Sequence, residues 1–150
     1  MIASALLARQ GHRLLQLGVG LLLATSFEGF AIPYMASPML GRSVHTLTAL
    51  LAVLLMPLGL LWPRLRLGPK AARLAFWFLL YSGLAIDFAF VLAAIWGAGN
   101  TTMPLAAGSA RGTPLQELTI RIISYSSGPT GITAFALIFW GLRVDADQAA

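Results

Sequence analysis

Four long apolar segments, separated by turns rich in proline, glycine or basic residues, are the feature that most constrains how this chain can fold. We place them at residues 14–35, 44–62, 74–96 and 118–142, and we expect Ser126-Ser127-Gly128-Pro129 to interrupt the fourth. Each has about 19 to 25 residues, which suits a helix crossing a bilayer core of roughly 30 Å. The sequence therefore predicts an all-α fold, a four-transmembrane-helix bundle that forms a single domain over residues 1–150.

Composition excludes most classes of water-soluble protein. Hydrophobic residues make up 58% of the chain and charged residues only 10%, whereas soluble domains carry about 25% charged residues. The formal charge of +5 does not indicate nucleic acid, because no basic stripe with interleaved aromatic residues is present. The absence of cysteine excludes disulfides, thiolate metal sites and cysteine nucleophiles. We expect a multi-pass protein of a bacterial-type inner membrane whose surroundings are lipid.

The basic residues predict an orientation, because lysine and arginine concentrate in cytoplasmic loops. Four spans place both ends of the chain on one side of the membrane. Seven basic residues would share that side, namely Arg9, Arg13, Arg64, Arg66, Lys70, Arg73 and Arg143. Three would lie on the other, namely Arg42, Arg111 and Arg121. The sequence therefore predicts that both termini are cytoplasmic.

His45 is the candidate metal ligand, since ionisable side chains inside membrane spans are costly and usually functional. At helical spacing its face continues through Thr48, Ala49 and Ala52, and such small side chains permit close approach of a flat cofactor or another helix. Two histidines cannot form a zinc site of the usual composition, but haem needs only one protein ligand. The alternative is an interfacial histidine bonded to a carbonyl group.

Acidic residues mark further candidates within or beside the spans. Asp87 lies midway along the third segment, where we expect a site role or an arginine partner from a neighbouring helix. Glu28 in the first segment is either a functional carboxylate or a hydrogen-bonded or protonated structural residue. Tyr81 lies six residues before Asp87, on a different helical face. Glu117 and Arg121 are spaced for an i,i+4 ion pair at the start of the fourth helix; a role at the mouth of a site is the weaker alternative.

Two blocks of sequence resemble the hydroxylaminobenzene mutases. Residues 29–47 read GFAIPYMASPMLGRSVHTL, where that family has a Pro, an Asn-Pro, a Met-Gly and a Ser-x-His-Leu in the same order. The second block consists of LAAIWGAG at 92–99, MPLAAG at 103–108 and RGTPLQE at 111–117. The resemblance covers about residues 14–143, and the mutases are themselves similar to styrene oxide isomerases, which are small four-helix membrane proteins.

The resemblance implies a homotrimer with haem b at its subunit interfaces, the iron held by the histidine at the start of the second helix, here His45. It also implies that ferric haem acts as a Lewis acid on a small apolar aromatic substrate. An epoxide would become an aldehyde, or the hydroxyl of a hydroxylamine would move onto the ring. A metal polarises oxygen without proton exchange, and a dry pocket protects a cationic intermediate. Thr48, Ala49 and Ala52 are then the expected cofactor contacts.

Three positions depart from the family pattern. Leu51 and Ile86 stand where the family has asparagine, and Phe90 stands where the isomerases have a tyrosine. Asp87 and Tyr81 are the candidate catalytic replacements, with Tyr125 as a further source of hydrogen bonds. Two alternatives to an isomerase remain open at this point. They are a non-catalytic haem protein and a haem-free carrier or accessory subunit of a larger membrane complex.

Overall fold

The structure, a computed structural model, describes residues 2–143. Within this range the chain forms helices and loops, and the long helices are α1 (Ile2–Ala31), α2 (Pro38–Leu61), α3 (Pro69–Trp96) and α5 (Pro114–Gly141). The connections contain the short elements η1 (Ile32–Tyr34), η2 (Trp62–Arg64) and α4 (Pro104–Ala107). The four long helices are each long and apolar enough to cross a membrane. The prediction of an all-α chain with four such helices is therefore confirmed.

Local sequence signals explain where the helices begin and end. The hydroxyl of Ser37 caps α2 by accepting the N–H of Leu40 at 3.4 Å, and Thr113 forms a capping box with Gln116 at the start of α5. Proline stands in the first turn of α2, α3 and α5, where its missing N–H costs nothing. Gly97 ends α3 in the left-handed conformation, with φ of 62°.

The helices differ from the predicted segments in two respects. First, α2 begins at Pro38, so that His45 lies about two turns inside the helix rather than at its start. Second, the predicted interruption of the fourth segment at residues 126–129 was wrong, because α5 is continuous through Pro129. The hydroxyl of Thr130 donates to the carbonyls of Ser126 and Ser127, and that of Thr133 donates to the carbonyl of Pro129 itself, so side-chain bonds support the helix where one backbone bond is lost.

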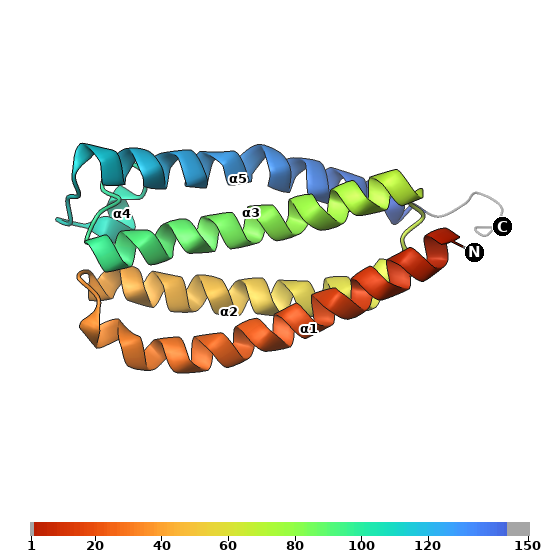
Figure 1. Cartoon of the computed structure of the whole chain (residues 1–150), viewed down its shortest axis with the longest axis horizontal. Helices are drawn as coiled ribbons and strands as arrows, with labels where there is room; N and C mark the ends of the chain where they lie inside the picture. The colour runs from red at the N-terminus through yellow and green to blue at the C-terminus, as the bar shows by residue number, and fades with distance from the viewer. Residues whose placement is uncertain (1, 144–150) are drawn as a thin grey trace.

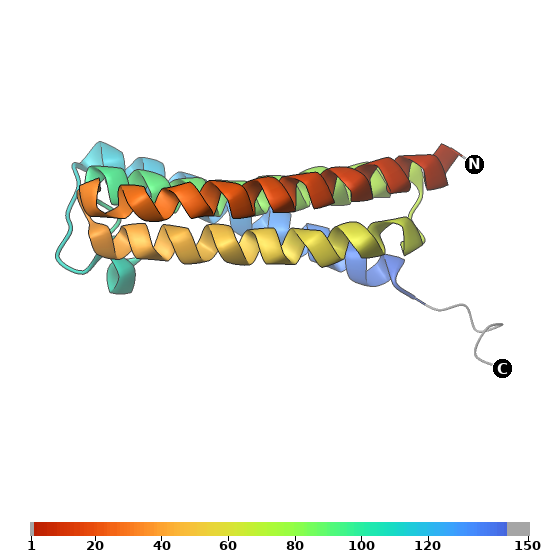
Figure 2. The same cartoon turned by 90° about the horizontal axis from the view of Figure 1, so that it is seen from below.

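The bundle consists of two helix pairs, α1 with α2 and α3 with α5, joined by contacts between α2 and α3 (Figures 1 and 2). The start of α1, the connection from α2 to α3, and the end of α5 all lie at one end of the bundle (Figure 1). The seven basic residues that the sequence assigns to one side therefore gather at this end. Arg42, Arg111 and Arg121 lie toward the opposite end, which holds the connection from α3 to α5.

Glycines allow α1 and α2 to approach closely. A Cβ at Gly11 would lie 2.6 Å from the carbonyl oxygen of Gly59, and one at Gly18 would lie 3.0 Å from that of Ala52. Side chains at these positions would collide with backbone. Contact between small residues is the usual way in which membrane helices gain packing.

Two apolar clusters fill the bundle, and the candidate polar residues lie between them along α2. One cluster, toward the end where the described chain begins, includes Leu14, Leu55 and Trp62. The other, toward the connection from α3 to α5, includes Val44 and Ala93. Polar groups at this boundary are therefore held between well-packed layers.

Candidate functional site

The imidazole of His45 is directed from α2 toward α1. Its Nδ1 lies 3.3 Å from the hydroxyl oxygen of Thr25, which also lies 3.1 Å from the carbonyl oxygen of His45. A Cβ at Gly29 would lie 3.8 Å from Cε1 of the ring, so this glycine leaves space open beside the imidazole. Among residues 2–143, the only hydrogen-bond contact of the ring is the one at Nδ1. Nε2 is therefore the nitrogen left for a ligand.

Glu28 belongs to the same cluster. Its Oε2 lies 3.2 Å from the hydroxyl of Thr25, one helical turn earlier on α1. Thr25 is only 7% exposed, so its hydroxyl connects the carboxylate to the imidazole in a largely water-free setting. Both sequence interpretations of Glu28 are compatible with this contact. The spacing of Thr25 and Glu28 was visible in the sequence, but their proximity to His45 was not.

Asp87 meets α2 from the opposite side. Its Oδ1 accepts the hydroxyl of Thr48 at 2.9 Å, and Thr48 lies one turn after His45. The partner of Asp87 is thus a threonine, and no ion pair with arginine forms among the described residues. Polar groups from α1, α2 and α3 therefore meet at one level of the bundle.

Two of the three positions that depart from the family pattern, Leu51 and Ile86, lie beside Asp87. Leu51, Ile86 and Asp87 line one cavity of about 220 Å³ between α2 and α3. A Cβ at Gly83 would lie only 2.5 Å from Cδ1 of Leu51, so the leucine fills a notch that glycine provides. Phe90 packs instead against the apolar cluster around Val44. Asp87 is thus the polar group beside the two apolar replacements.

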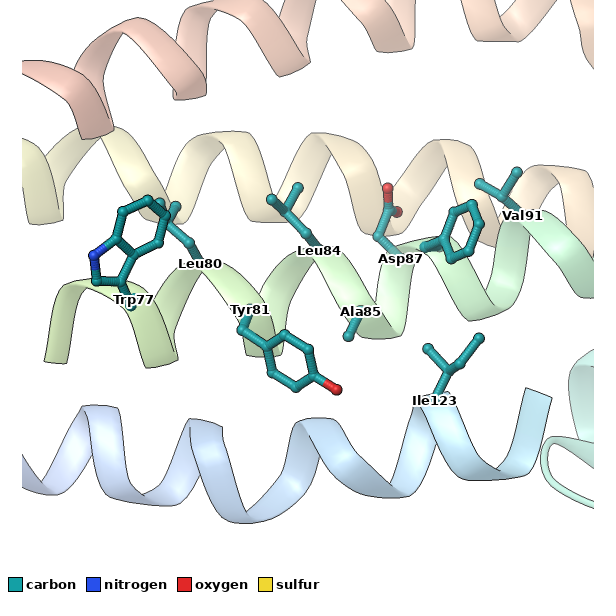
Figure 3. A pocket seen from close by; sticks show the side chains of 9 residues that line it. Trp77, Leu80, Tyr81, Leu84, Ala85, Asp87, Val91 and Ile123 are labelled. Carbon is teal, nitrogen blue, oxygen red and sulfur yellow. The ribbon is translucent and has the colours of Figure 1, made fainter. Parts of the chain in front are cut away.

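A larger cavity, of about 740 Å³, lies along α3, and α5 contributes Ile123 to its lining. Its lining is mainly aromatic and aliphatic and consists of Trp77, Leu80, Tyr81, Leu84, Ala85, Asp87, Phe88, Val91 and Ile123. Asp87 is the charged member of this set. Figure 3 shows Asp87 directed toward α2 and Tyr81 directed toward α5, although both belong to the same lining. The two side chains point apart, as their different helical faces indicate.

The hydroxyl of Tyr81 already has a partner. It lies 2.7 Å from the hydroxyl of Ser126 on α5, and the neighbouring Ser82 donates to the carbonyl of Ser127 at 2.9 Å. Tyr125 is 64% exposed and stands apart from these contacts. The pairing of Ser126 with Tyr81 could not be predicted from the sequence, because the register of α5 against α3 depends on packing.

The small residues after His45 differ in their exposure. Thr48 and Ala52 are buried, at 4% and 0% exposed, by contacts with α3 and α1, whereas Ala49 is half-buried. Contact of these three residues with a cofactor therefore stays a prediction. Between residues 2 and 143, no group of three or more potential metal-ligating side chains is present. A ligand that needs one histidine thus fits this chain better than a metal ion held by several side chains.

Glu117 corrects one prediction. It does not pair with Arg121, because its carboxylate accepts bonds from the connection between α3 and α5 instead. The donors are the N–H groups of Gly99, Asn100, Thr101 and Gly112, at 2.8 to 3.3 Å, and the hydroxyl of Thr101 at 2.7 Å. Backbone N–H groups in an irregular loop need acceptors, and the carboxylate supplies them at the start of α5. Glu117 is thus a structural anchor.

Comparison with known proteins identifies the family. A sequence model of styrene oxide isomerase matches residues 10–143. Hydroxylaminobenzene mutase HabB from Ectopseudomonas oleovorans is 44% identical over 132 residues, which cover 88% of this chain and 80% of HabB. Hydroxylaminobenzene mutase HabA from the same organism is 36% identical over 126 residues, which cover 83% of this chain and 93% of HabA.

No solved structure matches the chain. The matches to the two mutases and to the family model nonetheless extend over nearly the whole described range, including His45 and Asp87. The chain thus belongs to the styrene oxide isomerase family, whose members include the hydroxylaminobenzene mutases, and it is an enzyme of the isomerase class.

Proposed function

We propose that this protein is a membrane-embedded, haem b-dependent mutase that moves the hydroxyl of a small aromatic hydroxylamine from nitrogen to the ring. The mutase names of the two relatives support this substrate class. Isomerisation of a small aromatic epoxide to an aldehyde is the second candidate, which the family model favours. Both reactions are internal rearrangements, so the products contain the same atoms as the substrates.

The observation that carries the cofactor assignment is the environment of His45. One ring nitrogen is held by Thr25, the other has no hydrogen-bond partner among the described residues, and Gly29 leaves space beside the ring. These residues fit a haem whose iron takes a single histidine. His45 would hold the iron through Nε2, and Ala49, which is half-buried, would lie nearest on the same helical face. When bound, ferric haem would supply a Lewis acid that polarises the substrate oxygen.

The cavity along α3 suits an aromatic substrate. Its volume of about 740 Å³ and its apolar lining resemble those of small-molecule sites, which combine an apolar wall with a few polar groups. Trp77, Leu84 and Phe88 would contact the ring and exclude water. Exclusion of water protects a cationic intermediate from hydrolysis.

Asp87 is the residue we assign to proton transfer. In the mutase reaction, the ring carbon that gains the hydroxyl loses a proton and the nitrogen gains one. Oδ1 of Asp87 is held by Thr48 at 2.9 Å, which leaves Oδ2 to carry that proton. The catalytic role predicted for Tyr81 has less support, because its hydroxyl is bonded to Ser126.

The orientation and assembly follow from the charge distribution and the resemblance. We propose that the end of the bundle that carries Arg9, Arg13, Arg64, Lys70 and Arg73 is cytoplasmic in a bacterial inner membrane, with both termini on that side. A homotrimer is the proposed assembly, supported by the family resemblance alone. Native mass spectrometry from detergent would give its subunit number.

Turnover without a reductant tests the proposed activity. Protein purified in detergent is incubated with phenylhydroxylamine, and in parallel with styrene oxide, under argon with no electron donor. We expect aminophenol from the first substrate, no product from His45→Ala, and a loss on the order of 10²-fold in kcat for Asp87→Asn. Product from neither substrate with haem-loaded wild-type protein would overturn the proposal.

A further inference from the structure

Resting on the proposed function, we infer that Thr25 and Glu28 of α1 are positioning residues that fix His45 as the tautomer with its proton on Nδ1, so that Nε2 carries the lone pair for iron. Neither residue belongs to the family motif that contains His45. Both lie on a different helix from the histidine, and they reach it through one hydroxyl group.

The hydrogen-bond donors and acceptors of the cluster indicate this tautomer. The hydroxyl of Thr25 has one proton and faces three groups, namely Oε2 of Glu28 at 3.2 Å, the carbonyl oxygen of His45 at 3.1 Å and Nδ1 of His45 at 3.3 Å. A carboxylate and a carbonyl only accept hydrogen bonds. The hydroxyl proton is therefore drawn to one of those two oxygens, and the hydroxyl oxygen is left to accept a proton from Nδ1.

A neutral imidazole carries one N–H, so protonation at Nδ1 leaves Nε2 unprotonated. Nε2 is the nitrogen with no hydrogen-bond partner among residues 2–143. In metal sites, the ligating histidine almost always donates its other N–H to an acceptor, which fixes the tautomer and raises the basicity of the ligand. Thr25 fills that place directly, and Glu28 orients it.

Burial makes the arrangement effective. Thr25 is 7% exposed and Glu28 is half-buried, so water competes little for these groups in the apolar interior. The contact also ties the ring plane of His45 to α1. A hydroxyl on this face of α1 therefore acts on the cofactor site without touching substrate.

The first measurement reads the tautomer in haem-free protein by ¹⁵N NMR of labelled histidine at mildly alkaline pH. The His45 signals are assigned by their loss in His45→Gln. We expect Nδ1 protonated in wild-type protein and in Thr25→Ser, which keeps the hydroxyl, and a shift toward protonated Nε2 in Thr25→Val. Protonated Nε2 in wild-type protein, or an unchanged tautomer in Thr25→Val, would overturn the inference.

The second measurement is haem titration followed by absorbance. We expect affinity to fall by about 10- to 100-fold in Thr25→Val and by less than about twofold in Thr25→Ser. Thr46→Val is the matched control, because that hydroxyl lies beside His45 but donates to the carbonyl of Arg42 at 3.0 Å. In Glu28→Gln, loss of the charge should raise the midpoint potential of the haem. Equal losses in Thr25→Val and Thr46→Val would contradict the inference.

The two measurements separate this inference from the proposed function. Wild-type protein that binds no haem, but shows His45 protonated at Nδ1 through Thr25, would overturn the proposed cofactor and support the tautomer assignment. Wild-type protein that binds haem, with Thr25→Val equal to it in tautomer, affinity and potential, would leave the proposed function standing and overturn the role of Thr25.

Discussion

The α1–α2 pair and the α3–α5 pair use their intramembrane polar residues differently. In α3–α5, Tyr81 meets Ser126, and Ser82 donates to the carbonyl of Ser127, so that groups on one helix satisfy groups on the other. In α1–α2, Thr25 contacts Nδ1 of His45 and leaves Nε2 without a partner in the described chain. The α3–α5 contacts join two helices, whereas the α1–α2 contact joins two helices and also leaves one imidazole nitrogen available for the ligand that we propose.

The two pairs also differ in how their helices approach one another. Gly11, Gly18 and Gly59 bring the backbones of α1 and α2 into direct contact. Between α3 and α5, a Cβ at Gly131 would instead meet the hydroxyl of Ser82 at 2.5 Å. The α1–α2 pair thus combines direct backbone contact with the hydrogen bonds of Thr25, whereas in the α3–α5 pair the hydroxyl of Ser82 lies in the space beside a glycine.

The largest effect on folding is expected from Gly11→Val. The new side chain would meet the carbonyl of Gly59, from which even a Cβ would be only 2.6 Å away, and we expect a loss of about 3 kcal/mol in the free energy of unfolding. Gly20→Val is the matched control, because no atom lies within 4 Å of a Cβ there. Unfolding in mixed detergent with SDS measures both. Equal stability of the two variants would show that α1 and α2 do not pack in this way.

A smaller effect is expected from Glu117→Ala, which removes the acceptor for the loop between α3 and α5. We expect a loss of about 2 kcal/mol and faster hydrogen exchange at the amides of Gly99, Thr101 and Gly112. Arg121→Ala should change neither quantity, since Glu117 bonds to the loop. Equal losses in the free energy of unfolding of the two variants would instead support the i,i+4 ion pair that the spacing of these residues predicts.

The smallest effect is expected from Tyr81→Phe. Loss of its 2.7 Å contact with Ser126 should cost about 0.6 kcal/mol, the average for a hydrogen bond between membrane helices. It should leave kcat within about threefold of wild type, because Asp87 is the residue that we propose for proton transfer. Tyr125→Phe, at an exposed position, should cost nothing measurable. A loss of turnover in Tyr81→Phe comparable to that of Asp87→Asn would instead place Tyr81 among the catalytic residues.

Some parts of this structure follow from sequence and others do not. The length and spacing of the apolar segments predict four long helices, because bilayer thickness sets the length of a span. His45 and Asp87 stand out because charged or ionisable groups are rare in such segments. Thr25 does not stand out, since a threonine inside a membrane helix usually bonds to its own backbone.

Partners across helices depend on register, which the sequence pattern does not determine here. The pairing of Tyr81 with Ser126, and of Thr48 with Asp87, joins residues 45 and 39 positions apart. Two predictions, an interruption of the helix near Pro129 and an ion pair of Glu117 with Arg121, were wrong for a related reason. Sequence rules pair each residue with its neighbours in the chain. In the structure, threonine hydroxyls bond to the helix around Pro129, and loop N–H groups bond to the carboxylate of Glu117.

The absorption spectrum of detergent-purified protein tests most directly whether the α1–α2 pair presents His45 to haem. Wild-type protein and His12→Ala, which changes the other histidine of the chain, should both show a Soret band at close to one haem per His45. The Soret band should be absent from His45→Ala. A wild-type protein without that band after haem loading, or a His45→Ala variant that keeps it unchanged, would contradict the account.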